Sequence, residues 1–137
     1  MPRPLRLTLL AALLCGLLSG FPGAMVAPAQ AQSGYGWTDG RNGPLRAGCH
    51  GYRYHWVLKP RTNDWLFETF LIDPSGRKLA SGMLDSDSEQ KRDHSRFRFC
   101  RYSTRPGRFT IRARLTWYDG YTDHHVWLNA SHFRLHR

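Results

Sequence analysis

Four arginines stand at alternate positions in two consecutive segments of the chain, a pattern in which guanidinium groups can bind an anion. They are Arg96, Arg98, Arg112 and Arg114. If residues 94–102 and 108–117 form a hairpin about Arg105, the two pairs of arginines face each other. Like charges on directly opposite residues of neighbouring strands are unfavourable. A fold that nevertheless keeps four arginines together often does so to bind an anionic partner. The pattern predicts binding of a polymer that carries phosphates, sulfates or carboxylates.

Two other interpretations of these arginines remain open. They can form a solvated face with the acids of the 85–93 loop folded over it, because surface charge often serves solubility. The connection between the two segments can also cross from one sheet to another, which would separate the two pairs. Nucleic acid is disfavoured as the physiological partner, because the chain carries an export signal and its aromatic residues stand at positions that suit a core.

Aromatic side chains flank a predicted turn at Asp119-Gly120. They are Tyr118, Tyr121 and Trp127. Exposed rings at these positions could stack on sugar rings or anchor a protein partner. An alternative function is therefore a protein-binding or inhibitory secreted domain that uses residues 118–127. The competing structural interpretation is that the rings fold over and close one end of the domain.

Asp123, His124 and His125 lie beside the same turn and support a further alternative, a small secreted hydrolase or metal-binding protein. The two histidines are weak candidates for metal ligands, and no metal is predicted. The sequence lacks a Gly-x-Ser-x-Gly motif, a His-Glu-x-x-His motif and a glycine-rich phosphate loop, so it predicts no catalytic residue and no cofactor. Glu68 is the one acid inside an apolar segment, and we expect it at a sheet edge or paired with an arginine.

Residues 1–31 have the pattern of a secretory signal peptide. Two arginines precede an apolar run from Leu7 to Leu18, and Ala29-Gln30-Ala31 provides a small-residue cleavage site. The run is shorter than the roughly 20 apolar residues that span a membrane. We therefore expect a secreted, extracellular protein that is cleaved near Ala31 and has no transmembrane segment in the mature chain.

Cys49 and Cys100 are the cysteines that would remain after this cleavage. Export would place them in an oxidising space, and their even number predicts a disulfide bond. Neither stands in a Cys-x-x-Cys motif, so a reactive thiol is the less favoured alternative. Closing a loop of about 50 residues stabilises a fold by about 4 kcal/mol in the chain-entropy model.

Short β-favouring segments separated by turns are predicted to position these residues. The segments are 52–58, 65–72, 77–84, 94–102, 108–117 and one or two more between 126 and 135, with a bulge near Asn129. The predicted fold is an all-β, single antiparallel β-sandwich of about six or seven strands with one disulfide. Residues 49–137 form this domain, and the glycine-rich residues 32–48 are expected to be a flexible lead-in.

One segment resembles a known family. Pro106-Gly107-Arg108-Phe109-Thr110-Ile111, followed by Leu115-Thr116 and Asp119, resembles the late-strand signature of immunoglobulin-like modules of the PKD type in secreted bacterial proteins. The resemblance implies an immunoglobulin-like sandwich with an adhesive or ligand-presenting role. It carries over no catalytic residue.

The composition fits one small binding domain. The sequence has 137 residues, a formal net charge of +10 and 13% aromatic residues. This length leaves little room for a two-lobed cofactor enzyme or a multi-pass membrane protein, and the aromatic content exceeds that of disordered chains. The sequence thus predicts a small secreted cationic module that binds a partner at or outside the cell surface and catalyses nothing.

Overall fold

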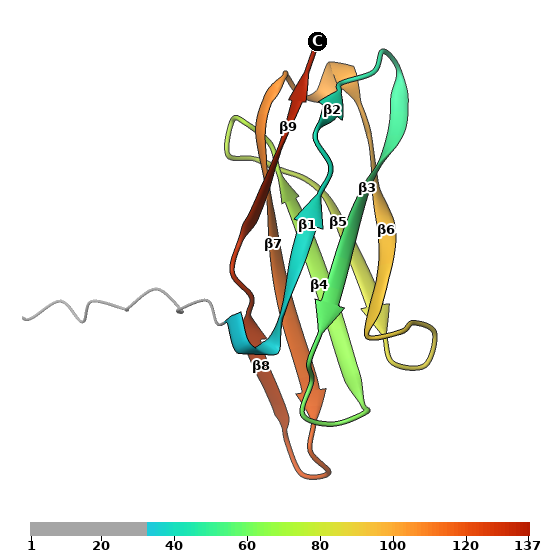
Figure 1. Ribbon diagram of the computed structural model, residues 1–137, viewed down its shortest axis with the longest axis vertical. Helices are drawn as coiled ribbons and strands as arrows, with labels where there is room; N and C mark the ends of the chain where they lie inside the picture. The colour runs from blue at the N-terminus through green and yellow to red at the C-terminus, as the bar shows by residue number, and fades with distance from the viewer. Residues whose placement is uncertain (1–32) are drawn as a thin grey trace, which may run out of the picture.

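Mostly antiparallel strands build the structure, a computed structural model that describes residues 33–137 (Figure 1). The predicted signal peptide lies outside the described residues. The elements in chain order are η1 (Ser33–Tyr35), β1 (Gly36–Gly40), β2 (Gly43–Pro44), β3 (Cys49–Leu58), β4 (Trp65–Ile72), β5 (Lys78–Asp85), β6 (Arg92–Cys100), η2 (Arg101–Ser103), β7 (Gly107–Tyr118), β8 (Asp123–Trp127) and β9 (Ser131–His136).

The strands form two sheets that pack face to face. One sheet has the order β1-β3-β6, and the other has the order β2-β9-β7-β4-β5, with β8 paired to β7 as well. The chain changes sheet at each step from β1 to β4, and again between β5 and β6 and between β6 and β7. Crossings of this kind are typical of the Greek-key connections of β-sandwiches. The predicted all-β sandwich is therefore confirmed.

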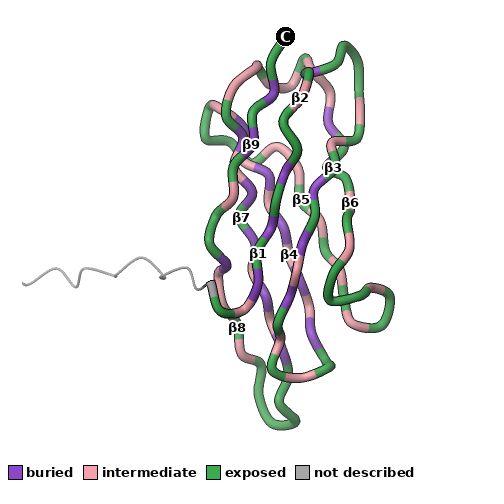
Figure 2. Tube along the Cα trace, in the orientation of Figure 1, coloured by how far each residue is buried: buried purple, intermediate pink, exposed green. Residues whose placement is uncertain are grey.

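Buried residues alternate with more exposed ones along the strands (Figure 2), and the buried apolar side chains form the core between the sheets. Phe109, Ile111 and Leu115 of β7 are fully buried, as the alternation in the sequence predicted. Trp56 and Phe97 of the opposite sheet belong to the same core. The residues between these positions face outward and form the two outer surfaces of the sandwich.

The prediction that residues 32–48 form a flexible lead-in is wrong, because β1 and β2 lie in this segment. Two of its glycines, Gly36 and Gly40, allow close packing. A Cβ atom added at Gly36, where φ is +136°, would collide with the carbonyl oxygen of Val57 on β3. A Cβ atom added at Gly40 would collide with the ring of Phe133. The glycines thus allow β1 to approach its neighbours, and the sandwich begins before residue 49.

The hairpin considered for residues 94–102 and 108–117 does not form. The alternative, in which the connection crosses from one sheet to the other, is confirmed, because β6 and β7 belong to different sheets. Each of these strands presents an aromatic row to the core. Phe99 of β6 and Phe109 of β7 stack with their ring centroids 5.8 Å apart. Placing the two strands in opposite sheets buries both rows against each other, which pairing in one sheet could not do.

The predicted disulfide bond between Cys49 and Cys100 is confirmed. The two cysteines are directly opposite each other at one end of the β3–β6 pair. The bond joins residues 51 positions apart in the sequence and fixes the end of the sheet that carries the candidate site. Among the helices of residues 33–137, none has the length and hydrophobicity that a membrane crossing requires.

Candidate anion-binding site

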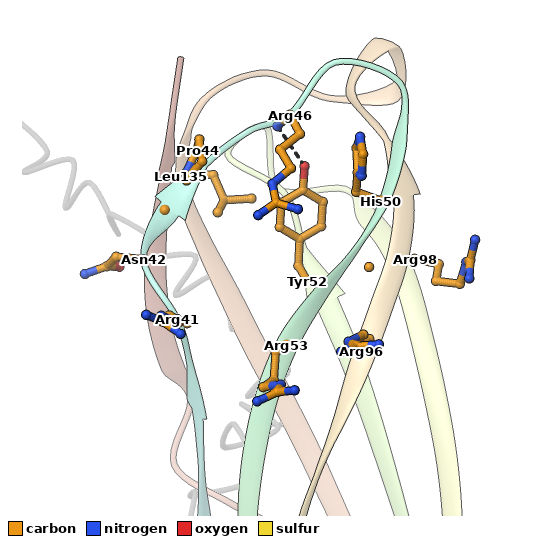
Figure 3. A pocket seen from close by; sticks show the side chains of 12 residues that line it. Arg41, Asn42, Pro44, Arg46, His50, Tyr52, Arg53, Arg96, Arg98 and Leu135 are labelled. Atoms are coloured by element: carbon orange, nitrogen blue, oxygen red, sulfur yellow. Dashed lines mark hydrogen bonds between the residues drawn. The ribbon is translucent and has the colours of Figure 1, made fainter.

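A groove opens where β1 leaves the three-stranded sheet. β1 pairs with β3 only as far as Gly40, which lies opposite Tyr54. The chain then crosses to the other sheet, where β2 pairs with β9. Residues 41–46 and the first half of β3 form two walls, with a cavity of about 690 Å³ between them (Figure 3). We call this cavity the basic groove; its arginines are Arg41, Arg46, Arg53, Arg96 and Arg98.

Two of these arginines face each other on neighbouring strands. Arg53 of β3 lies directly opposite Arg96 of β6 on the outer surface of the sheet, and both are exposed. The ion pairs found in residues 33–137 involve Arg77, His94, Arg114 and His124, and none of the groove arginines. The groove therefore concentrates positive charge that no acidic side chain of the described chain neutralises by direct contact.

Gly51 shapes the position of Arg96. A Cβ atom added at Gly51 would lie 3.0 Å from Cδ and 3.3 Å from Cβ of Arg96. The aliphatic stem of Arg96 thus lies against the bare backbone of Gly51, in space that any other residue would fill. This contact places Arg96 over the strand that borders the groove.

Tyr52 forms the floor of the basic groove together with Leu135. The ring of Tyr52 stacks on Phe99, with the centroids 4.4 Å apart. Its hydroxyl oxygen accepts a hydrogen bond of 3.1 Å from the backbone N–H of Arg46, drawn as a dashed line in Figure 3. This bond ties the wall formed by residues 41–46 to β3, so the two walls hold a fixed separation.

His50 closes the upper end of the groove (Figure 3). Its Nε2 atom lies 2.7 Å from the carbonyl oxygen of Ala47, which makes Nε2 the donor of that hydrogen bond. At the other end of the same outer surface, His55 faces His94, whose Nδ1 atom is 2.9 Å from a carboxylate oxygen of Asp93. The acidic residue of β6, Asp93, therefore lies outside the basic groove.

Arg112 and Arg114 lie on the outer surface of the other sheet, so the predicted face of four arginines does not form. Nε of Arg114 donates a 2.6 Å hydrogen bond to the Glu68 carboxylate, which confirms the expected pairing of Glu68 with an arginine. The guanidinium of Arg112 lies 4.8 Å from the ring centroid of Trp127. Both side chains are thus engaged within their own sheet.

A second pair of facing arginines, Arg108 and Arg134, lies on β7 and β9. Neither residue lines the basic groove. The backbone N–H of Arg134 donates a hydrogen bond to the side-chain oxygen of Asn42. Asn42 lines the groove, so this pair lies next to one groove wall and offers the same local charge as Arg53 and Arg96 without lining the groove itself.

The aromatic residues of the 118–127 turn do not form one exposed surface. Tyr121 is 94% exposed and Tyr118 is 41% exposed, both near the end of the β7–β8 hairpin. Trp127 lies opposite Arg114, four positions from Tyr118 along β7, and packs on Phe70 with the centroids 5.9 Å apart. The rings neither converge on one ligand nor close the end of the core.

The histidines of this hairpin point to opposite sides of the sheet. His124 stacks on the buried Trp117, whereas His125 lies on the exposed surface. Nε2 of His124 is 2.6 Å from the carboxylate of Asp119. This hydrogen bond, with those from the backbone N–H groups of Thr122 and Tyr121, lowers the pKa of Asp119 to about 2. In residues 33–137, no three His, Cys, Asp or Glu side chains gather as a metal site would require.

Sequence reasoning identified Arg96 and Arg98 of the groove but missed Arg41, Arg46 and Arg53. Arg53 stands between Tyr52 and Tyr54 in a predicted strand, so its outward position was available from alternation. Arg41 and Arg46 lay in the segment predicted to be flexible. No known family model matches the chain, and no curated protein matches it significantly.

Proposed function

We propose that this protein is a small secreted cationic module that catalyses no reaction and binds an anionic polymer in the basic groove. In this proposal the module acts at or outside the cell surface, as an immunoglobulin-like domain of the PKD type would. Carboxylate, sulfate and phosphate groups all match the planar donors of arginine, which bind such anions in a bidentate manner.

The position of Arg53 directly opposite Arg96 carries the proposal. Two like charges at facing positions of a sheet destabilise the fold, and an acid or a neutral residue at either position would remove that cost. A bound anion between the two guanidinium groups turns the same positions into favourable contacts. The facing pair Arg108 and Arg134 lines no such groove, so the groove together with the pairing of Arg53 and Arg96 supports a ligand at this position.

The shape of the groove supports a polymer over a single small ion. Arg41, Arg53 and Arg96 come from three neighbouring chain segments and lie across the lower part of the groove (Figure 3). Arg46 lies farther along the same wall. Positive charge spread along a cavity favours a ligand with repeated negative charges, and low-dielectric walls strengthen the local potential.

Salt-dependent retention on immobilised heparin, polyphosphate and polyglutamate tests this proposal. We expect the protein without its signal peptide to bind at least one of them, with an affinity that falls as salt increases. The variant Arg53→Gln/Arg96→Gln should bind at least about tenfold more weakly and show a shallower dependence on salt.

The matched control is Arg108→Gln/Arg134→Gln, which removes the same charge from a facing pair outside the groove. This control should retain most of the affinity. Equal losses in the two double variants would show that binding depends on net charge alone, and the proposed site would then be wrong.

A further inference from the structure

The first half of β3 has a free edge inside the basic groove. On one side of β3, the N–H of Lys59 donates to the carbonyl oxygen of Tyr35, just before β1. On the other side, the N–H of Leu58 donates to the carbonyl oxygen of Lys91, just before β6. Successive residues of a strand direct their backbone groups to opposite edges. Odd-numbered residues of β3 therefore face β1, and even-numbered residues face β6.

This alternation directs the backbone N–H and C=O groups of Gly51 into the groove. The β1–β3 ladder ends at the pair of Gly40 and Tyr54, and within residues 33–137 no other strand takes the place of β1 beyond that point. An extended segment lying there would continue the sheet as an added strand beside β3.

The two surfaces of such a strand would meet different surroundings. Side chains that point outward would lie beside Arg53 and Arg96, which share the outer surface of the sheet with Gly51. Side chains that point inward would lie over the ring of Tyr52 and beside Leu135, the floor of the groove. Alternation along a strand thus fits a ligand in which acidic and apolar residues alternate.

We propose that the basic groove binds an extended acidic polypeptide segment, which adds to β3 as an edge strand with carboxylates outward and apolar side chains inward. This inference rests on the proposed function and names the chemical class of its polymer. Strand pairing uses both the N–H and the C=O of Gly51, a combination that polyphosphate cannot match because it has no donor group, and the arginines supply the charge selectivity.

A peptide of four Glu-Val repeats, blocked at both ends, tests the proposal with the mature protein. The peptide is expected to lie antiparallel to β3, as β1 does. In that orientation, with glutamates outward, the glutamate N–H groups face β3 and the valine N–H groups face away. N-methylation of the glutamates removes the donors that pair with β3, whereas N-methylation of the valines leaves them intact. Both modified peptides carry the same charge and the same number of methyl groups.

We expect the glutamate-methylated peptide to bind at least about tenfold more weakly than the unmodified peptide, because it loses the strand-pairing hydrogen bonds. The valine-methylated peptide should stay within about threefold of the unmodified one. Binding of the unmodified peptide should also slow hydrogen exchange at the Gly51 amide.

Other outcomes separate this inference from the proposed function. Equal binding of all three peptides, or heparin retention that depends on Arg53 and Arg96 without any peptide binding, would overturn strand addition and leave the anion-binding groove standing. Protection of β5 or β6 amides in place of Gly51 would assign the peptide to another sheet edge and overturn it too. If no probe bound, both proposals would fail.

Discussion

Arg53 and Arg96 lie directly opposite each other on the outer surface of the three-stranded sheet, beside a groove in which neither forms an ion pair with the described chain. Favourable cross-strand pairs stabilise a sheet by roughly 0.2–1 kcal/mol each, whereas like charges directly opposite each other destabilise it. The pair should thus lower the stability of the free protein, and in the proposed function it supplies two adjacent donors to an anion.

Substituting Gly51→Ala tests whether the absence of a side chain at position 51 sets the position of the Arg96 side chain. The added Cβ would lie 3.0 Å from Cδ of Arg96, so the arginine stem must move away. We expect affinity for the polyanion to fall by about threefold to tenfold. The free energy of unfolding should change by less than about 1 kcal/mol, because the displaced atoms belong to a flexible exposed side chain.

The control for Gly51→Ala is Gly43→Ala. Gly43 also lines the groove, but a Cβ atom added there has no atom within 4 Å. Isothermal titration of both variants with the same polyanion makes the comparison, and equal effects of the two substitutions would argue against a positioning role for Gly51.

Removing the disulfide with Cys49→Ser/Cys100→Ser should lower the free energy of unfolding by about 4 kcal/mol, as expected for a closed loop of this length. The bond fixes the end of β3 and β6 next to His50, so anion affinity should also fall. Urea unfolding and polyanion titration measure the two effects. Unchanged affinity in a folded double variant would show that this end of the sheet does not need the covalent link to hold the groove.

Stability should fall below about pH 4 because of Asp73, which begins the turn between β4 and β5. Burial alone would raise the pKa of this carboxyl group. Hydrogen bonds from the backbone N–H groups of Arg77 and Ser75, from the Arg77 guanidinium and from the Thr104 hydroxyl outweigh burial and lower the pKa. Because the folded pKa lies below the unfolded value of about 3.9, Asp73 stabilises the fold above that value and loses its contribution as the pH falls through the folded pKa.

The variant Asp73→Asn should therefore unfold more easily than the wild type at pH 7, by about 1–3 kcal/mol. Its stability should decline less steeply between about pH 5 and pH 2. Urea unfolding across this range measures both curves, and parallel curves would contradict the assignment. The hydrogen bonds from the Thr104 hydroxyl to Asp73 and from Arg77 to the Ser103 carbonyl oxygen also tie this turn to the connection that carries the chain from β6 to β7.

Glu68→Gln tests the independence of the two outer surfaces. It removes the ion pair with Arg114 and should lower the free energy of unfolding by about 1 kcal/mol, since the carboxylate is mostly buried. The basic groove belongs to the other sheet, so the affinity for the polyanion should stay the same within about twofold. A large gain in affinity would show that the freed Arg114 contributes to binding and that the two surfaces act together.

Local patterns in the sequence predicted the strands well. Residues 65–72 form β4 as predicted, and the alternating segment at 108–117 forms β7 with one extra residue at each end. Cys49 and Cys100 pair as the even cysteine count indicated. These features depend on side-chain periodicity and residue type, which the sequence displays directly.

The site itself depends on long-range pairing, which periodicity does not determine. Arg96 has an outward position in any sheet, but its partner depends on whether β6 joins β3 or β7, and that choice follows from how two aromatic rows pack in the core. Gly36 and Gly40 have the composition of a linker, although each permits a close approach that only the folded structure reveals. Sequence reasoning therefore identified two arginines of the basic groove and placed them opposite the wrong neighbours.

Thermal unfolding of the wild type and of Arg53→Glu, with and without the polyanion retained most strongly, tests the central claim most directly. The substitution puts a carboxylate opposite Arg96, so the free variant should be more stable than the wild type by roughly 0.2–1 kcal/mol, which raises Tm by a few degrees. The polyanion should raise the Tm of the wild type, because it binds the folded state, and leave that of the variant nearly unchanged. Equal increases in Tm for both proteins, or a variant less stable than the wild type, would contradict the claim that Arg53 and Arg96 are paired to bind an anion.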